Sequence, residues 1–194
     1  MRQALIVVAV LTLVGCAAGR DFSRPQAESF QIGKTTSTEV AARYGDPYRT
    51  GTETRNGETI TTAVYSYAKA TPYVDDVPAR TARFYFLRDV LTGYDFTSSF
   101  PEDKTAFDSA KVAQIRRGET TRQQVLELLG QPGGVYAYPV IKGKDATGLV
   151  YRFVDTNHTP MVPGSLRVKI KHLVISVGGD GRVTDVDYSE SNPR

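Results

Sequence analysis

Runs of alternating apolar and polar residues recur along the chain and predict a protein built largely from β-strands. Alternation places successive side chains on opposite faces of a strand, and Phe84 and Phe86 illustrate it within one run. Threonine, valine, isoleucine and aromatic residues, which favour strands, are frequent in these runs. The predicted strands are residues 60–68, 81–88, 90–98, 134–138, 149–154, 166–177 and 182–189. The glycine-rich segment 178–181 predicts a hairpin between the last two.

Two short amphipathic helices are predicted by apolar residues that recur three and four positions apart. Each begins at a capping box, in which a threonine hydroxyl and an acid or amide three residues later satisfy free amide groups. Each ends at a glycine followed two residues later by a proline. These helices are predicted at residues 37–44 and 122–129. A further short helix is predicted before each of them, at 26–32 and 109–116.

The helix signals belong to an internal repeat with an offset of 85 residues. Over residues 33–47 and 118–132, six of fifteen positions are identical without a gap. A second matching stretch, 91–99 with 183–191, follows at an offset of 92. Two matches in the same order favour a duplication. The motif residues are Gly33, Thr36, Gly45 and Pro47 in the first copy, and Gly118, Thr121, Gly130 and Pro132 in the second.

The order of elements predicts an α+β fold of two tandem units. Each unit is expected to be a helix pair packed on an antiparallel meander of three to four strands. The units are expected at residues 22–99 and 107–191, with a linker at 100–106.

The first residues have the pattern of a bacterial secretion signal. One arginine precedes about eleven apolar residues, a stretch too short to span a membrane. The sequence Leu-Val-Gly-Cys that ends at Cys16 resembles a lipobox, and Cys16 is the only cysteine in the chain. We therefore expect a signal peptide at 1–15 and a lipidated tether at 16–21. The residue after Cys16 is alanine, so the aspartate that resembles an inner-membrane retention signal is absent, and we expect the periplasmic face of the outer membrane.

The repeated motif, joined to a lipobox, resembles the start of the BamE (SmpA/OmlA) family of outer-membrane lipoproteins. The motif reads glycine, one residue, two threonines, three residues, valine, four residues, then Gly-x-Pro, as in residues 33–47. The resemblance implies two helices on a three-stranded antiparallel sheet, here twice. Such tandem units are also similar in arrangement to the β-lactamase inhibitory proteins, whose long concave sheet grips an enzyme.

Composition and charge argue against several classes of function. Basic residues exceed acidic ones by only three (24 against 21), which does not indicate a nucleic-acid binder. One cysteine and two histidines, at positions 158 and 172, give no metal-ligand spacing. Ser98 and Ser99 have no nearby histidine and no nucleophile-elbow pattern. We therefore expect no catalysis, no metal and no cofactor.

Two proline-bearing loops, residues 69–80 and 155–164, are the candidate recognition loops. Their apolar residues are Tyr73, Val74, Met161 and Val162, which are predicted to contact a protein partner, although the loops could also be surface filler. The aromatic residues of the strands are expected to form the core, with part of them lining an open sheet face as the alternative. The expected function is a protein-binding scaffold or assembly accessory of the cell envelope, and the alternative is an inhibitor of a periplasmic enzyme.

Overall fold

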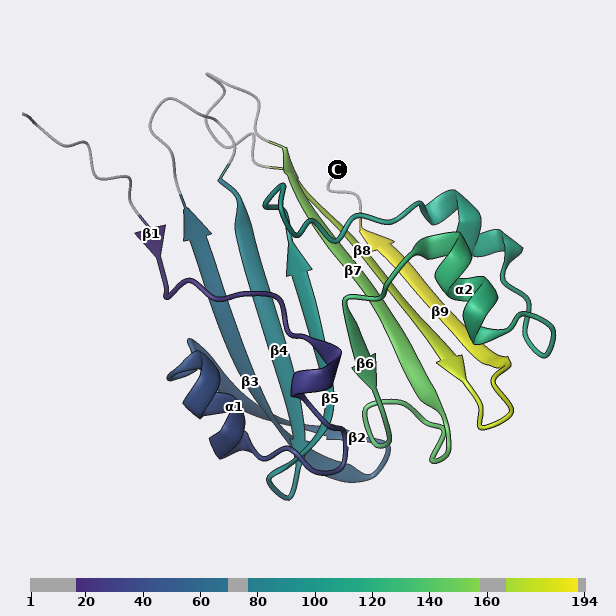
Figure 1. The fold of residues 1–194 in the computed structure, drawn as a ribbon, viewed down its shortest axis with the longest axis horizontal. Helices are drawn as coiled ribbons and strands as arrows, with labels where there is room; N and C mark the ends of the chain where they lie inside the picture. Colours follow the sequence, from purple (N-terminus) through teal and green to yellow (C-terminus); the bar gives the residue numbers. More distant parts are fainter. Residues whose placement is uncertain (1–16, 70–76, 158–166, 192–194) are drawn as a thin grey trace, which may run out of the picture.

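A computed structural model describes residues 17–69, 77–157 and 167–191 (Figure 1). Within these residues the chain forms one antiparallel sheet of nine strands, in the order β1-β3-β4-β5-β6-β7-β8-β9, with β2 also paired to β3. The strands are β1 Ala17–Ala18, β2 Arg49–Arg55, β3 Glu58–Lys69, β4 Ala79–Leu87, β5 Val90–Ser98, β6 Gly134–Tyr136, β7 Thr147–Asn157, β8 Arg167–Val177 and β9 Val183–Ser191.

Two α-helices are present in the described residues, α1 Ser37–Tyr44 and α2 Arg122–Leu129, with the predicted bounds. Both capping boxes are formed, and each helix ends at a glycine with positive φ, 81° at Gly45 and 78° at Gly130. The ψ angles of −158° and −166° are extended, so neither glycine has the left-handed helical conformation that is usual after a helix. Both conformations still favour glycine, because a side chain is disfavoured at positive φ.

Each helix is tied to the sheet by the same backbone bonds. The amide of Gly33 donates to the carbonyl of Leu91, and the amide of Gly118 donates to Val183, at 2.8 and 2.7 Å. Isolated bridges join Thr36 to Val90 and Thr121 to Arg182. These contacts follow the offsets of the sequence repeat, so the repeated motif encodes the attachment of a helix to a strand.

Both helices lie on the same face of the sheet (Figure 1). Strand pairing places Tyr94 of β5 opposite Val135 of β6, and Val135 opposite Leu149 of β7, so these side chains share one face. Tyr94 belongs to the apolar cluster under α1 and Leu149 to the cluster under α2. The opposite face therefore carries no α-helix in the described part of the chain, and we call it the helix-free face.

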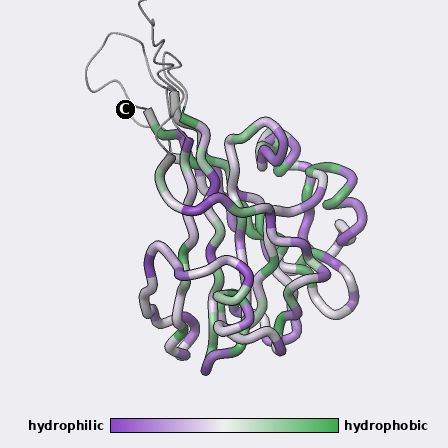
Figure 2. The backbone as a smooth tube through the Cα atoms, turned by 60° about the vertical axis from the view of Figure 1, so that its left-hand side comes forward, coloured by the Kyte–Doolittle hydropathy of each residue, from purple (hydrophilic) through white to green (hydrophobic). Residues whose placement is uncertain are grey.

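The core under α1 is aromatic, whereas the core under α2 is mostly aliphatic. Rings of Phe30, Tyr44 and Phe84 pack within 6 Å of one another, at centroid distances of 5.2–5.9 Å. Under α2, Val125 meets buried leucine, isoleucine and valine side chains of β7, β8 and β9. Apolar and polar segments alternate along the strands, as expected for a sheet with two different faces (Figure 2).

The predicted fold class, two tandem units of a helix pair on a meander, is wrong. One sheet runs through both halves, because β6 pairs with β5 on one side and with β7 on the other. The predicted helices at 26–32 and 109–116 are only 3-10 turns, Ala27–Ser29 and Ser109–Gln114. Segments this short gain little from helix formation, and both end in an extended residue, Phe30 or Ile115, that is buried in the core.

Strand β2 was missing from the prediction. Its sequence, Arg-Thr-Gly-Thr-Glu-Thr-Arg, has no apolar residue, and six of its seven residues are exposed. It is held by its backbone ladder to β3 and by the turn at Asn56-Gly57, where both residues have positive φ.

In the described residues, no helix is long and apolar enough to cross a membrane.

Candidate functional site

The helix-free face contains a hollow of about 650 Å³ that reaches from the β2–β3 turn to β9. Its floor is made by side chains that alternate with those of the helix-covered core. Its apolar part is a separate cluster, which packs the β6–β7 loop onto β3 and β4. The cluster includes Tyr85 of β4, Tyr136 of β6 and Ile141 of the loop.

A buried carboxylate, Asp95 of β5, lies beneath two tyrosines that line the hollow. Its oxygens accept hydrogen bonds from Arg83 at 3.1 Å, from the hydroxyl of Tyr85 at 3.0 Å and from that of Tyr136 at 2.7 Å. Asp95 is fully buried, so this charge depends on its donors. Burial, followed by the nearby charge of Asp95, raises the pKa of Tyr85 and Tyr136, and both hydroxyls therefore remain protonated donors at neutral pH.

Charged and titratable side chains form a row that crosses the helix-free face from β4 to β9. The row consists of Arg83, Asp95, Arg152, His172 and Asp187. Arg152 of β7 lies directly opposite His172 of β8 in the strand pairing, so the two side chains share this face. The residues come from both halves of the chain, and the row exists only because the sheet is continuous.

Arg152 and His172 differ from the Arg83–Asp95 pair because each has one buried nitrogen atom that no residue in the described ranges satisfies. The Nε atom of Arg152 and the Nε2 atom of His172 are buried without a hydrogen-bond partner. Both residues line the hollow. Burial, and then the positive charge of Arg152, lowers the pKa of His172, so the imidazole is neutral at pH 7.

The β6–β7 loop closes one side of the hollow and joins the two halves of the chain. The side-chain amide of Asn56 donates to the carbonyl of Pro139 at 2.8 Å, and the hydroxyl of Tyr138 donates to the carbonyl of Asn56 at 3.2 Å. The loop thus holds the β2–β3 turn next to the hollow. Lys142 of the loop and Arg55 of β2 line the same hollow.

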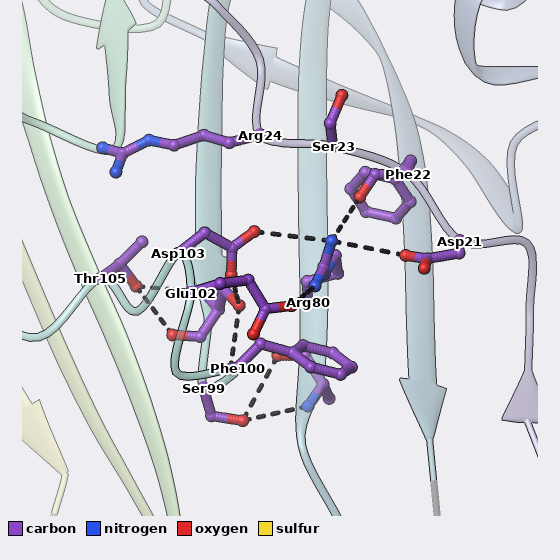
Figure 3. A network of polar contacts seen from close by, with 12 residues as sticks. Asp21, Phe22, Ser23, Arg24, Arg80, Ser99, Phe100, Glu102, Asp103 and Thr105 are labelled. Carbon is purple, nitrogen blue, oxygen red and sulfur yellow. Dashed lines mark hydrogen bonds and ion pairs between the residues drawn. The ribbon is translucent and has the colours of Figure 1, made fainter.

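A second polar centre, at Arg80, holds the N-terminal segment against the sheet (Figure 3). Its guanidinium contacts Glu102 at 2.7 Å, Asp21 at 3.4 Å and Asp103 at 3.6 Å. It also donates to the carbonyl of Phe22 at 2.8 Å. The side chain is only 8% exposed, so these contacts fix the segment that follows the predicted lipidation site.

The residues predicted to contact a partner lie outside the described residues. This applies to Tyr73, Val74, Met161 and Val162, and also to Cys16. The motif residues Gly33, Gly45, Gly118 and Gly130 all have positive φ, and Thr36 and Thr121 are the N-caps of the helices. Pro47 and Pro132 follow the two helices, so these eight residues shape the helix ends rather than the hollow.

Most aromatic residues of the strands lie in the core, as predicted from the sequence. Tyr65, Phe84, Phe86, Tyr94 and Phe96 are buried on the helix-covered face. The only large hydrophobic side chains that are exposed in the described ranges are Tyr48 and Val77, which do not line the hollow.

The polar residues that line the hollow or lie beneath it were not predicted from the sequence. Asp95 sits within a run of aromatic and threonine residues, and a buried charge at such a place is the signal that could have drawn attention to it. Its partners lie 10 to 41 residues away along the chain, at separations that depend on the order of the strands. No group of three or more metal-binding side chains occurs in the described ranges.

Comparison with known proteins gives one distant structural neighbour. A crystal structure of a Streptococcus mutans protein, described as a "putative beta-lactamase inhibitor protein", superposes with a TM-score of 0.41 and 12% identity. The match covers 81% of this chain and 83% of that chain. No protein-family model and no curated protein sequence matches, so the resemblance to the BamE family has no support from these comparisons.

Proposed function

We propose that this chain is a non-catalytic protein-binding module that holds its partner on the helix-free face of the sheet. The observation that carries the proposal is the hollow of about 650 Å³, with two buried polar atoms that have no partner in the described part of the chain. The tyrosines and arginines that line or border it are residue types that concentrate in the energetic centres of protein interfaces. Because no large apolar side chain is exposed in the hollow, the expected interface is polar.

The proposed location is the periplasmic face of the outer membrane, with Cys16 as the lipid attachment site. The lipobox-like sequence and the position of the only cysteine support this location. Acyl chains supply most of the membrane affinity of such an anchor. We expect Cys16→Ser to move the protein from the membrane fraction to the soluble or uncleaved fraction, as measured by fractionation and by the mass of the mature N-terminus. Unmodified Cys16 in soluble wild-type protein would contradict the anchor.

Two kinds of partner fit the binding role. A BamE-like scaffold or assembly accessory would bind an envelope assembly or structural protein, whereas an inhibitor would bind a periplasmic enzyme across the sheet. The partner distinguishes them: a hydrolase favours the inhibitor, and an envelope assembly or structural protein favours the scaffold.

The binding face is tested with photo-crosslinking residues placed on the two sides of the sheet. Positions Thr81 and Ser176 report on the helix-free face, and Ala42 and Glu127 report on the outer surfaces of the helices. The full-length protein is illuminated in cells, and crosslinked products are identified by mass spectrometry. We expect a shared partner from Thr81 and Ser176 and none from the helix positions. The reverse pattern would show that the helices carry recognition.

A further inference from the structure

The row of charges across the helix-free face contains one cation that no described residue balances. Arg83 is paired with Asp95 at 3.1 Å. At the edge of the hollow, Arg55 contacts Glu53 at 3.0 Å, and Asp185 is paired with Arg117. None of the ion pairs among the described side chains includes Arg152, and its Nε atom is buried there without a hydrogen-bond partner. A partly buried guanidinium without an acceptor is costly and is therefore ready to bind one.

We infer that the hollow receives an acidic side chain of the protein partner, whose carboxylate binds the guanidinium of Arg152 beside the imidazole of His172. This inference rests on the proposed protein-binding function and names the chemistry of the contact. A guanidinium matches a carboxylate with parallel hydrogen bonds, and it can only donate. His172 adds a nitrogen, Nε2, that also lacks a partner in the described ranges.

The electrostatics of the hollow favour this occupant. Lys142 lines the hollow and adds a second positive charge. Asp187, the acid of the row without an ion pair among the described side chains, also lines the hollow, but it is exposed and lies on the outermost strand. Asp187 affects His172, which lies diagonally opposite it on β8. Arg152 is one strand further away, so Asp187 does not replace the missing counter-ion.

The volume of the hollow indicates that the carboxylate belongs to a ligand much larger than one carboxylate group. About 650 Å³ is far more than one carboxylate group fills, and several hundred cubic ångströms is the usual size of a site for a whole ligand. The remaining space borders the polar residues Asn56, Ser176 and Thr184 and residues of the β6–β7 loop. A protein loop with a central aspartate or glutamate would therefore meet the charge at the floor and polar groups along the walls.

The test uses a glutamate blocked at both its amino and carboxyl ends, and the equally blocked glutamine as the uncharged control. Full-length protein is titrated with each compound, while the side-chain resonances of its arginines and histidines are followed by NMR. We expect saturable shifts of Arg152 and His172 with blocked glutamate and none with blocked glutamine. Carboxylate binding should also raise the pKa of His172. Equal shifts with both compounds, or no saturable shift, would overturn the inference.

Substitutions locate the site and separate the inference from the proposed function. Arg152→Gln should weaken the binding of blocked glutamate about ten-fold or more, because hydrogen bonds between charged groups are among the strongest. Arg88→Gln, at an arginine outside the hollow that is paired with Glu58, should leave it unchanged. Tighter binding of inorganic phosphate than of blocked glutamate would also overturn it. If crosslinking from Thr81 and Ser176 succeeds but Arg152→Gln retains the partner, the binding face stands and the acidic contact is wrong.

Discussion

The two faces of the single sheet are built on different principles. The helix-covered face is closed by apolar contacts, as at Phe84, which is fully buried among the rings of Phe30, Tyr44 and Tyr94. The helix-free face buries charge instead, and Asp95 is as completely enclosed there as Phe84 is on the other side. On each strand, one set of alternating side chains thus forms the apolar core, and the other set forms the polar floor of the helix-free face.

This difference separates two kinds of interaction, apolar packing and buried polar contacts, within one layer of strands. Apolar packing is non-directional and tolerates variation if volume is kept, whereas a buried ionic group requires each of its partners. The helix-covered face can therefore hold the sheet together, while the helix-free face keeps groups whose hydrogen bonds are incomplete. Substitutions on the two faces should have different consequences.

The largest effect is expected for Phe84→Ala on the helix-covered face. Removal of a fully buried ring should lower the free energy of unfolding by about 3–5 kcal/mol, because it loses apolar burial and leaves a cavity. Urea unfolding measures the change. Thr81→Ala, on the same strand but on the helix-free face, should change it by less than about 0.5 kcal/mol. Similar losses for the two variants would show that the faces do not differ in this way.

A smaller but still substantial effect is expected for Asp95→Asn. The substitution leaves Arg83 without its counter-ion and gives a neutral acceptor to the two tyrosines, so the free energy of unfolding should fall by about 2–3 kcal/mol. Asp185→Asn, at an exposed acid paired with Arg117, should cost less than about 1 kcal/mol. If Asp95→Asn is neutral in urea unfolding, the buried network does not stabilise the helix-free face.

The end of a covering helix should tolerate a side chain poorly. In Gly130→Ala the new methyl group has room, since no atom lies within 4 Å of its position, but φ is 78°. The conformational strain should cost about 1–2 kcal/mol. Gly179→Ala in the β8–β9 turn meets equally open space without a positive φ and is the matched control. Equal melting temperatures for these two variants would contradict the conformation at Gly130.

The smallest expected effect is the pH dependence contributed by His172. Its pKa in the folded protein lies below the unfolded value, so the unfolded chain binds the proton more tightly. The contribution of His172 is complete above the unfolded pKa of about 6.5 and is lost as the pH falls through the lower, folded pKa. His172→Gln should remove this loss, as measured by urea unfolding between pH 7 and pH 5. An identical pH dependence in both proteins would show that the imidazole is not desolvated.

The parts of the fold that were predictable are those specified by local chemistry. Capping boxes and helix-ending glycines gave the bounds of α1 and α2, and alternation located seven of the nine described strands. The polar strand β2 was missed because its partner holds it through the backbone. The single sheet was missed because the pairing of β6 with β5 depends on contacts about 40 residues apart.

The candidate site was not predictable for the same reason. Arg152 and His172 become neighbours through the register of β7 and β8, and Asp95 joins them only through the order of the strands. Taken singly, each is an ordinary polar residue in a strand. The predicted contact loops followed from composition alone, and their residues Tyr73 and Met161 lie outside the described ranges, so their role stays a prediction.

The contacts of Arg80 would limit how far the body of a membrane-anchored protein can move from its anchor. Strand β1 pairs with the end of β3, and Arg80 binds Asp21 and Phe22. The residues after Cys16 are therefore fixed on the sheet and do not form a flexible tether. If Cys16 is acylated, the body has little freedom to swing or to rise from the bilayer. The body is then confined to a thin layer at the membrane surface. A short tether raises its effective concentration toward partners whose binding sites lie at the same distance from the membrane, and lowers it toward partners farther away.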